Sequence, residues 1–227
     1  MNPRSALVAG ASGLVGRAVL DELVADPLYG EIHVIARRPL ALDYPRVTAR
    51  VVDFNRLDAL ALPHIDDVYC CLGTTQKAAG SRDAFRLVDY TYVMEVARAA
   101  LRAGASRCGL VSAGGTSLRS PVFYSRVKAQ AERDIVSLGF SVTAIARPSL
   151  ITGERARLGQ PRRSGEGLAL VLLQPLAPFI PARWRPVAAS AVARALVRGL
   201  TQPAAMGVQI IESDVIQAFV NERACAS

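Results

Sequence analysis

The chain has 227 residues, which is enough for one domain with a large core and a little short for two. Its composition, 51% hydrophobic and 20% charged, is typical of a soluble globular protein. The net charge of +8 is carried almost entirely by scattered arginines, with no basic helix face and no aromatic RNA-binding motif, so we do not expect nucleic acid as a partner.

The four cysteines have no metal-ligand spacing, and with two histidines they predict no zinc site. Cys70 and Cys71 lie in an apolar run, where free cysteine behaves as a small hydrophobe. No signal peptide precedes the first apolar run, and the later run 168–180 contains two prolines and is too short to span a bilayer. We therefore expect a cytoplasmic protein without a membrane span. Its oligomeric state is left open.

The chain begins with a glycine-rich turn between a strand and a helix. Residues 6–9 are continuously apolar, which is typical of a strand buried on both faces of a parallel sheet. We expect Gly10 to allow a tight exit from this strand, Gly13 to let a pyrophosphate approach the backbone, and Gly16 to let the helix pack on the strand. The helix start would bind the phosphates. The residues expected to bind a dinucleotide in this turn are Gly10, Ser12, Gly13, Leu14, Val15 and Gly16.

Strands and helices alternate after this turn. The expected strands are residues 6–9, 31–36, 47–52, 67–72, 108–112 and 141–146. Long helices are expected at 84–103 and 122–138, each ended by a glycine. This alternation predicts an α/β fold of the Rossmann type, doubly wound, with a mainly parallel sheet and helices on both of its faces.

Ligands of such folds bind beyond the carboxyl ends of the strands. The loops after the expected strands all fall at that edge, so they extend the predicted cofactor site. The residues expected there are Asp53, Phe54, Leu72, Gly73, Thr74, Arg147, Pro148 and Ser149.

Arg37 and Arg38 end the second expected strand, where an NAD enzyme usually has an acid for the ribose hydroxyls. Two guanidinium groups suit a 2′-phosphate instead, because each planar fork can bind phosphate oxygens in pairs. The alternative is a solvated arginine pair in an arginine-rich protein. The pattern favours NADP(H) over NAD(H).

Tyr124 and Lys128 are four residues apart, so they share one face of the helix after the fifth expected strand. A phenol has an ordinary pKa of about 10, and a nearby ammonium lowers it by favouring the phenolate. The same ammonium can hold a nicotinamide ribose. A chance Tyr and Lys on a solvated helix is the competing interpretation. Ser112 ends the fifth strand and is a candidate hydrogen-bond donor to a substrate carbonyl, with Ser117 as the alternative serine.

The pattern weakens beyond residue 153. Residues 154–186 are polar, arginine-rich and proline-interrupted, and we expect them to form a lid over the substrate site within a single domain, 1–227. A short apolar helix is expected at 168–179, an amphipathic helix at 187–200 and a last strand at 208–211.

The glycine turn, Ser112, the pair Tyr124 and Lys128, and the run 147–149 together resemble the short-chain dehydrogenase/reductase superfamily in its atypical branch. The runs 71–75, 123–128 and 146–150 are similar, more narrowly, to bacterial NAD(P)-binding proteins related to the Tat-interacting tumour-suppressor oxidoreductase. The resemblance implies a Rossmann fold that binds NADP(H), with Tyr124 as the catalytic acid–base and Lys128 as its partner. It is weaker at Ser112, because Ala113 and Gly114 follow where many relatives have further serines.

Two functional classes remain from the sequence. The first is an NADPH-dependent reductase of a small carbonyl compound, in which Tyr124 protonates the carbonyl oxygen. The second is a regulatory or redox-sensing dinucleotide-binding protein with little or no turnover. The pair Tyr124 and Lys128 favours the first class, and the doubtful Ser112 favours the second.

Overall fold

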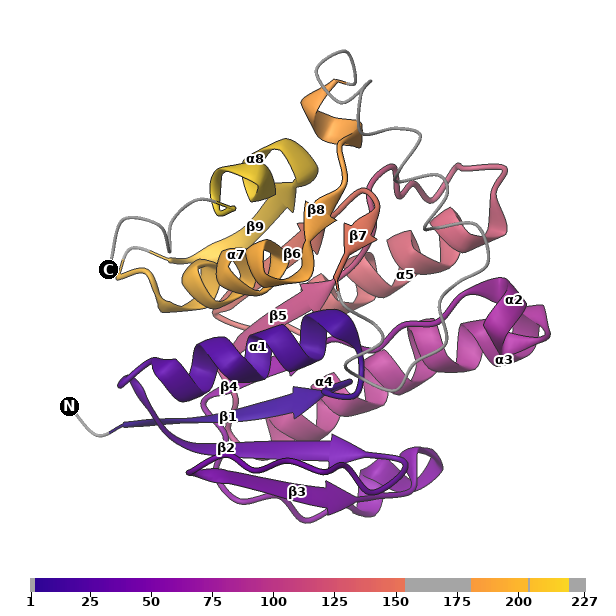
Figure 1. Cartoon of the computed structure of the whole chain (residues 1–227). Coiled ribbons are helices and arrows are strands. Elements are labelled where there is room, and N and C mark those ends of the chain that lie inside the picture. Colours follow the sequence, from indigo (N-terminus) through magenta and orange to yellow (C-terminus); the bar gives the residue numbers. More distant parts are fainter. Residues whose placement is uncertain (1–2, 154–180, 204, 221–227) are drawn as a thin grey trace.

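The computed structural model describes residues 3–153, 181–203 and 205–220 (Figure 1). Its centre is a parallel sheet of seven strands in the order β3-β2-β1-β4-β5-β6-β9. The strands are β1 (Arg4–Ala9), β2 (Tyr29–Ala36), β3 (Val47–Val51), β4 (Asp67–Cys70), β5 (Arg107–Val111), β6 (Val142–Arg147) and β9 (Gly207–Glu212). The predicted Rossmann-type fold is thus confirmed, and the order reverses between β1 and β4, where ligands of such sheets bind.

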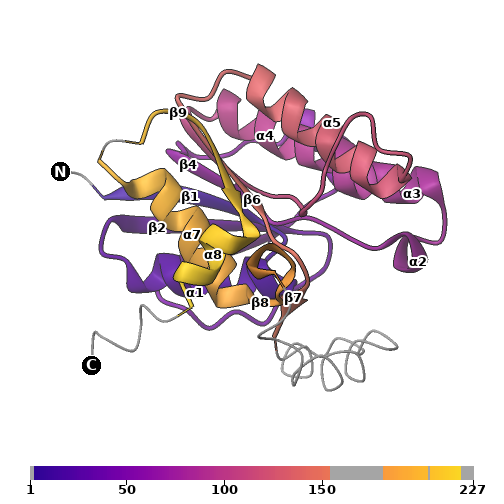
Figure 2. The ribbon, with the colours of Figure 1, turned by 90° about the horizontal axis from the view of Figure 1, so that it is seen from above.

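Helices cover both faces of this sheet (Figure 2). They are α1 (Leu14–Ala25), α2 (Gln76–Ala79), α3 (Arg82–Arg86), α4 (Tyr92–Arg102), α5 (Phe123–Ser137), α7 (Ala189–Thr201) and α8 (Ser213–Ala218). α4 and α5 lie on one side of the sheet, and α1, α7 and α8 lie on the other (Figure 2). None of the helices in the described ranges is long and apolar enough to cross a membrane.

Successive side chains of a strand point to opposite faces of the sheet, so each strand contributes to the core on both faces. Within β1, Leu7 and Ala9 pack with the α4 side chains, whereas Ala6 and Val8 pack with α1 and α7. All four side chains are fully buried, as expected for a strand covered on both faces. Burial on both faces explains why residues 6–9 have no polar alternation.

The expected helix at 84–103 is interrupted. α3 runs into a π-helical turn, η2 (Leu87–Thr91), and α4 follows without a break in the chain direction. A π-helical turn holds an extra residue within the helix, so the side chains before and after it are rotated relative to an unbroken α-helix. The interruption is important because η2 lies beside the site described below.

Short elements complete the carboxyl edge of the sheet. The chain forms 3₁₀ turns at η1 (Phe54–Ala59) and η5 (Ala182–Trp184). β7 (Ile151–Thr152) pairs with β8 (Val187–Ala188), so the first two residues of the helix expected at 187–200 are a strand, and α7 begins at Ala189. The expected helix at 168–179 and most of the expected lid, 154–180, lie outside the described residues.

Candidate functional site

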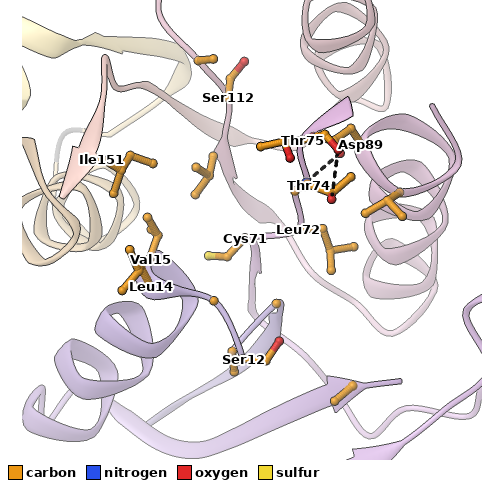
Figure 3. Close-up of a pocket in the computed structure, with 18 of the residues that line it drawn as sticks. Ser12, Leu14, Val15, Cys71, Leu72, Thr74, Thr75, Asp89, Ser112 and Ile151 are labelled. Atoms are coloured by element: carbon orange, nitrogen blue, oxygen red, sulfur yellow. Dashed lines mark hydrogen bonds between the residues drawn. The ribbon is translucent and has the colours of Figure 1, made fainter. Parts of the chain in front are cut away.

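A cavity of about 820 Å³ opens at the carboxyl edge of the sheet (Figure 3). Its wall comes from the segments that follow β1, β2, β4, β5 and β6, together with one face of α5 and the turn η2. This is the edge at which the sequence places its candidate residues. Segments far apart in the chain therefore meet around one space.

Residues 10–15 of the glycine turn line this cavity, whereas Gly16 lies outside the described cavity wall. Gly10 has a φ of +96°, and a Cβ there would lie 2.5 Å from the carbonyl oxygen of Cys71. A Cβ on Gly16 would overlap the carbonyl oxygen of Gly10, so α1 packs directly on the turn. Gly13 is different, because its Cβ would meet one described atom within 4 Å, the Gly10 oxygen at 3.3 Å.

The start of α1 has features that suit an anion. Gly13 is the N-cap residue and offers no side-chain hydrogen bond, and the first turn contains no acidic residue. The first amide groups of a helix have no partner within the helix, and the helix dipole favours negative charge there. Ser12, Leu14 and Val15 lie beside this helix start on the cavity wall (Figure 3).

Most other predicted cofactor residues also reach the cavity. Those on its wall are Phe54, Leu72, Gly73, Thr74, Pro148 and Ser149. Asp53 lines a neighbouring cavity of about 420 Å³, which shares Arg37 and Phe54 with the first. Its carboxylate accepts hydrogen bonds from the backbone and the side chain of Asn55, both at 2.9 Å.

Arg147 does not line the cavity in the described part of the chain. Its guanidinium forms ion pairs with Glu132 at 2.6 Å and with Glu212 at 2.9 Å. The hydrogen bond to Glu132 raises the pKa of Arg147. These contacts tie β6 to α5 and to the end of β9, which is a structural role.

Arg37 and Arg38 project from the end of β2 and line the cavity. Both side chains are exposed, and neither forms an ion pair with a carboxylate among the described residues. β2 ends at Ala36, and the two residues that follow it are these arginines and not an acid. Two exposed guanidinium groups therefore stand at the rim of the cavity in the described structure, and such groups can bind oxygens in pairs.

Tyr124 and Lys128 lie on one face of α5, and both line the cavity that the glycine turn also lines. The Tyr124 ring is half-buried and packs against Phe85, with ring centroids 5.4 Å apart. Lys128 is buried, and its Nζ lies 2.9 Å from Oδ1 of Asp89.

Burial lowers the pKa of Lys128, but the nearby negative groups outweigh this effect and the net direction is upward. Asp89 contributes through its charge and a hydrogen bond, and Tyr124 and Glu132 contribute through charge. The ion pair with Asp89 therefore favours the charged form of Lys128.

Ser112 lies at the end of β5, in the cavity wall (Figure 3). Its Oγ is buried and has no hydrogen-bond partner among the described residues. A buried hydroxyl without a partner is costly, so this atom is suited to a ligand. Ser117, the alternative serine, does not line the cavity in the described structure, and its Oγ accepts a hydrogen bond from the Arg119 amide.

Asp89 is the site residue that the sequence analysis missed. It is fully buried in η2, lines the cavity and contacts Lys128. A sequence signal exists, because Asp89 is spaced four residues from Phe85 and four from Val93, two apolar residues that are buried. An ionisable residue on a buried apolar stripe needs a charged partner.

The fold and this cavity together define a Rossmann protein that binds a dinucleotide. A family profile described as NAD(P)H-binding matches residues 10–168, and the chain belongs to this family. The rat protein HTATIP2 is 32% identical over 224 residues, covering 95% of this chain and 89% of its own length. The mitochondrial protein FMP52-1 of Scheffersomyces stipitis is 34% identical over 160 residues, covering 66% of this chain and 69% of its own length.

Solved structures share the fold. An oxidoreductase of the short-chain dehydrogenase/reductase family from Burkholderia thailandensis superposes with a TM-score of 0.71 at 19% identity, covering all of this chain and 99% of its own. MoeE5 in complex with UDP-glucose and NAD superposes with a TM-score of 0.67 at 17% identity, covering 96% of this chain and 81% of its own. The predicted relationship to the atypical short-chain dehydrogenase/reductases, including the Tat-interacting protein, is confirmed.

Proposed function

We propose that the protein is an NADP(H)-dependent oxidoreductase that reduces a small carbonyl compound. The observation that carries this proposal is the convergence of Ser112, Tyr124 and Lys128 on the cavity that also holds the glycine turn. A phosphate-binding turn alone would suit any dinucleotide-binding protein. A tyrosine, a buried lysine and a serine whose hydroxyl has no partner among the described residues are groups that can transfer a proton to a carbonyl oxygen and bind it.

The residues present fit the cofactor. Gly13 carries no side chain at the start of α1, where a pyrophosphate must approach the backbone, and the Ser112 Oγ lacks a partner among the described residues. The glycine turn would hold the phosphates, the rim arginines the 2′-phosphate, and Lys128 the ribose next to the nicotinamide. When bound, the reduced nicotinamide supplies the hydride.

Side chains of the protein would then bind the carbonyl oxygen and transfer a proton to it. Ser112 donates a hydrogen bond to the carbonyl oxygen and fixes its position. The Tyr124 hydroxyl donates a proton to the same oxygen as negative charge develops on it. The Lys128 ammonium stabilises the phenolate that remains, which lowers the barrier to the transfer.

The preference for NADPH over NADH can be tested by replacing Arg37 and Arg38 at the rim of the cavity. Replacing both Arg37 and Arg38 with Ala is expected to raise the Kd of NADPH by at least about tenfold, because charge-assisted hydrogen bonds of about 1.5–3 kcal/mol are lost. The Kd of NADH is expected to change by less than about twofold. Isothermal titration calorimetry of both cofactors measures the difference.

The control for this test is Arg98→Ala, since Arg98 is an α4 arginine that pairs with Glu95 and does not line the cavity. It is expected to leave both affinities unchanged. Equal losses of NADPH and NADH in the double variant would remove the argument for a 2′-phosphate site.

We also propose a cytoplasmic location. The support is the thiols of Cys70, Cys71 and Cys108, which are free and fit a reducing compartment. The fungal relatives FMP52-1 and FMP52 are named as mitochondrial proteins. Fractionation of the source cells, with antibody detection, is expected to find the chain in the cytosolic fraction, and recovery from a membrane or organelle fraction would contradict this.

A further inference from the structure

Two aromatic side chains at the start of α5 contact one buried ring of α3. The Phe85 side chain of α3 is fully buried, and its ring centroid lies 5.4 Å from that of Tyr124 and 5.9 Å from that of Phe123. The ring planes meet at 39° and 60°, which are tilted arrangements of the kind that aromatic pairs prefer to a face-to-face stack. α3 therefore contacts the first two residues of α5, beside which it lies in Figure 2.

The first turn of α5 has no side-chain cap. Its N-cap residue, Val122, is exposed and forms no side-chain hydrogen bond. The Ser125 hydroxyl donates instead to the carbonyl oxygen of Gly115, at 2.7 Å, which ties the turn to the loop after β5. The first amide groups of a helix have no partner within it, and the loss of a cap makes a helix start less stable. Packing on this turn therefore contributes to the position of Tyr124.

The Tyr124 side chain depends on this packing for its orientation. Its hydroxyl forms no hydrogen bond with another residue in the part of the chain that the structure describes, whereas its ring packs against Phe85. Rotation about the Cα–Cβ bond would move the hydroxyl across the cavity, because the ring is rigid and the hydroxyl lies at its far end. The neighbouring ring opposes this rotation.

α3 is anchored on both sides of this ring. Ser81 caps the helix, since its Oγ accepts a hydrogen bond from the helix backbone at 3.0 Å. The Arg82 guanidinium lies over the Phe123 ring, 5.3 Å from its centroid. Arg86 donates to Oε1 of Gln130 on α5, at 2.5 Å. These contacts join α3 to α5 before and after the aromatic contact, so α3 forms a fixed support.

We propose that Phe85 is a positioning residue, whose ring holds the Tyr124 side chain in the orientation that directs its hydroxyl into the cavity. This inference rests on the proposed function, in which that hydroxyl transfers the proton. Phe85 does not line the cavity in the described structure, so it acts through Tyr124 and not on a substrate. The orientation is important because a displacement of about 1 Å can lower a rate by about 10².

Replacing Phe85 with Leu is expected to lower kcat by about tenfold for any substrate that is turned over, and to leave KM and the Kd of NADPH within about twofold of the parent values. Leucine keeps the site apolar but has no flat ring. Phe85→Met, whose flexible thioether fills irregular gaps, is expected to act in the same direction and replaces the leucine variant if that protein does not fold. The loss is expected to be equal at every pH, because neither substitution removes a charge.

A double variant separates positioning from a general loss of structure. In Tyr124→Phe no hydroxyl remains to be oriented, so the addition of Phe85→Leu is expected to change the residual kcat by less than about twofold. A further loss as large as that in the parent background would overturn the proposal. Phe140→Leu is the matched control, because Phe140 is also buried on the α4 side of the sheet and has no ring contact with Tyr124 in the described structure. Its kcat is expected to equal that of the parent.

The orientation of the ring can also be measured without turnover. The sequence has six tyrosines, so protein labelled with 3-fluorotyrosine gives six ¹⁹F NMR signals, and Tyr124→Phe identifies the signal of Tyr124. In the protein without ligand, Phe85→Leu is expected to narrow this signal and to move it toward the position of free 3-fluorotyrosine, because the ring becomes mobile and loses its aromatic neighbour. In Phe140→Leu the signal is expected to stay as in the parent.

A Tyr124 signal of unchanged width and position in a folded Phe85→Leu protein would overturn the proposal. So would a Phe85→Leu protein that turns over its substrate as fast as the parent. A protein that reduces no carbonyl compound but shows the expected change in the ¹⁹F signal would refute the proposed function and retain the role of Phe85 in orienting the Tyr124 ring.

Discussion

Replacing Tyr124 with Phe is expected to lower kcat by a factor of about 10² to 10⁴, because the phenol hydroxyl is the proton donor of the proposed reaction. The Kd of NADPH is expected to stay within about threefold of the parent value, since the ring keeps its packing against Phe85. Steady-state kinetics with a carbonyl substrate found by screening, together with calorimetric titration of NADPH, measures both quantities.

Tyr90→Phe is the matched control. Its hydroxyl donates to Asp134 on α5 and the residue is not part of the described cavity wall, so kcat is expected to be unchanged. A Tyr124→Phe protein as active as the parent would leave the fold intact and rule out the proposed mechanism.

Replacing Gly13 with Val is expected to raise the Kd of NADPH by about 10² or more, because the side chain fills the space that a pyrophosphate needs and hydrogen bonds to a charged group are lost. Gly13 has extended backbone angles, φ −88° and ψ 167°, which valine can adopt, and its Cβ would lie 3.3 Å from the Gly10 carbonyl oxygen, a contact that a small shift relieves. The free energy of unfolding is therefore expected to change by less than about 1 kcal/mol. Calorimetric titration and urea denaturation check the two quantities.

Gly16→Ala is the contrasting variant, because its Cβ would overlap the backbone of Gly10. It is expected to lower the free energy of unfolding by about 1 to 3 kcal/mol or more, since overpacking forces the backbone to shift. A folded Gly13→Val protein that binds NADPH normally would place the phosphates away from the glycine turn.

The sheet could be predicted from the sequence because its central strands are buried on both faces. Residues 6–9 and the later apolar runs leave no polar alternation, and helices of regular spacing separate them. The carboxyl edge then follows from the parallel topology alone. This is why residues as distant as Gly13, Gly73 and Ser112 could be assigned to one site before any coordinates were known.

The details that could not be predicted depend on contacts between elements. Nothing in the spacing of residues 84–103 indicates that a π-helical turn holds Asp89 toward Lys128. The two-residue strands β7 and β8 are too short to carry a pattern of their own. Arg147 follows a strand like the other loop residues, and its pairing with Glu132 and Glu212 becomes visible only when α5, β6 and β9 are brought together.

The most direct test of the proposed function is hydride transfer itself. The protein is incubated with NADPH deuterated at the transferred position of the nicotinamide and with a panel of aldehydes and ketones, and the products are analysed by mass spectrometry. We expect alcohol products that carry one deuterium on the former carbonyl carbon, formed by the parent and almost absent with Tyr124→Phe. NADPH binding without any deuterated product across the panel would contradict the reductase and favour a dinucleotide-binding sensor.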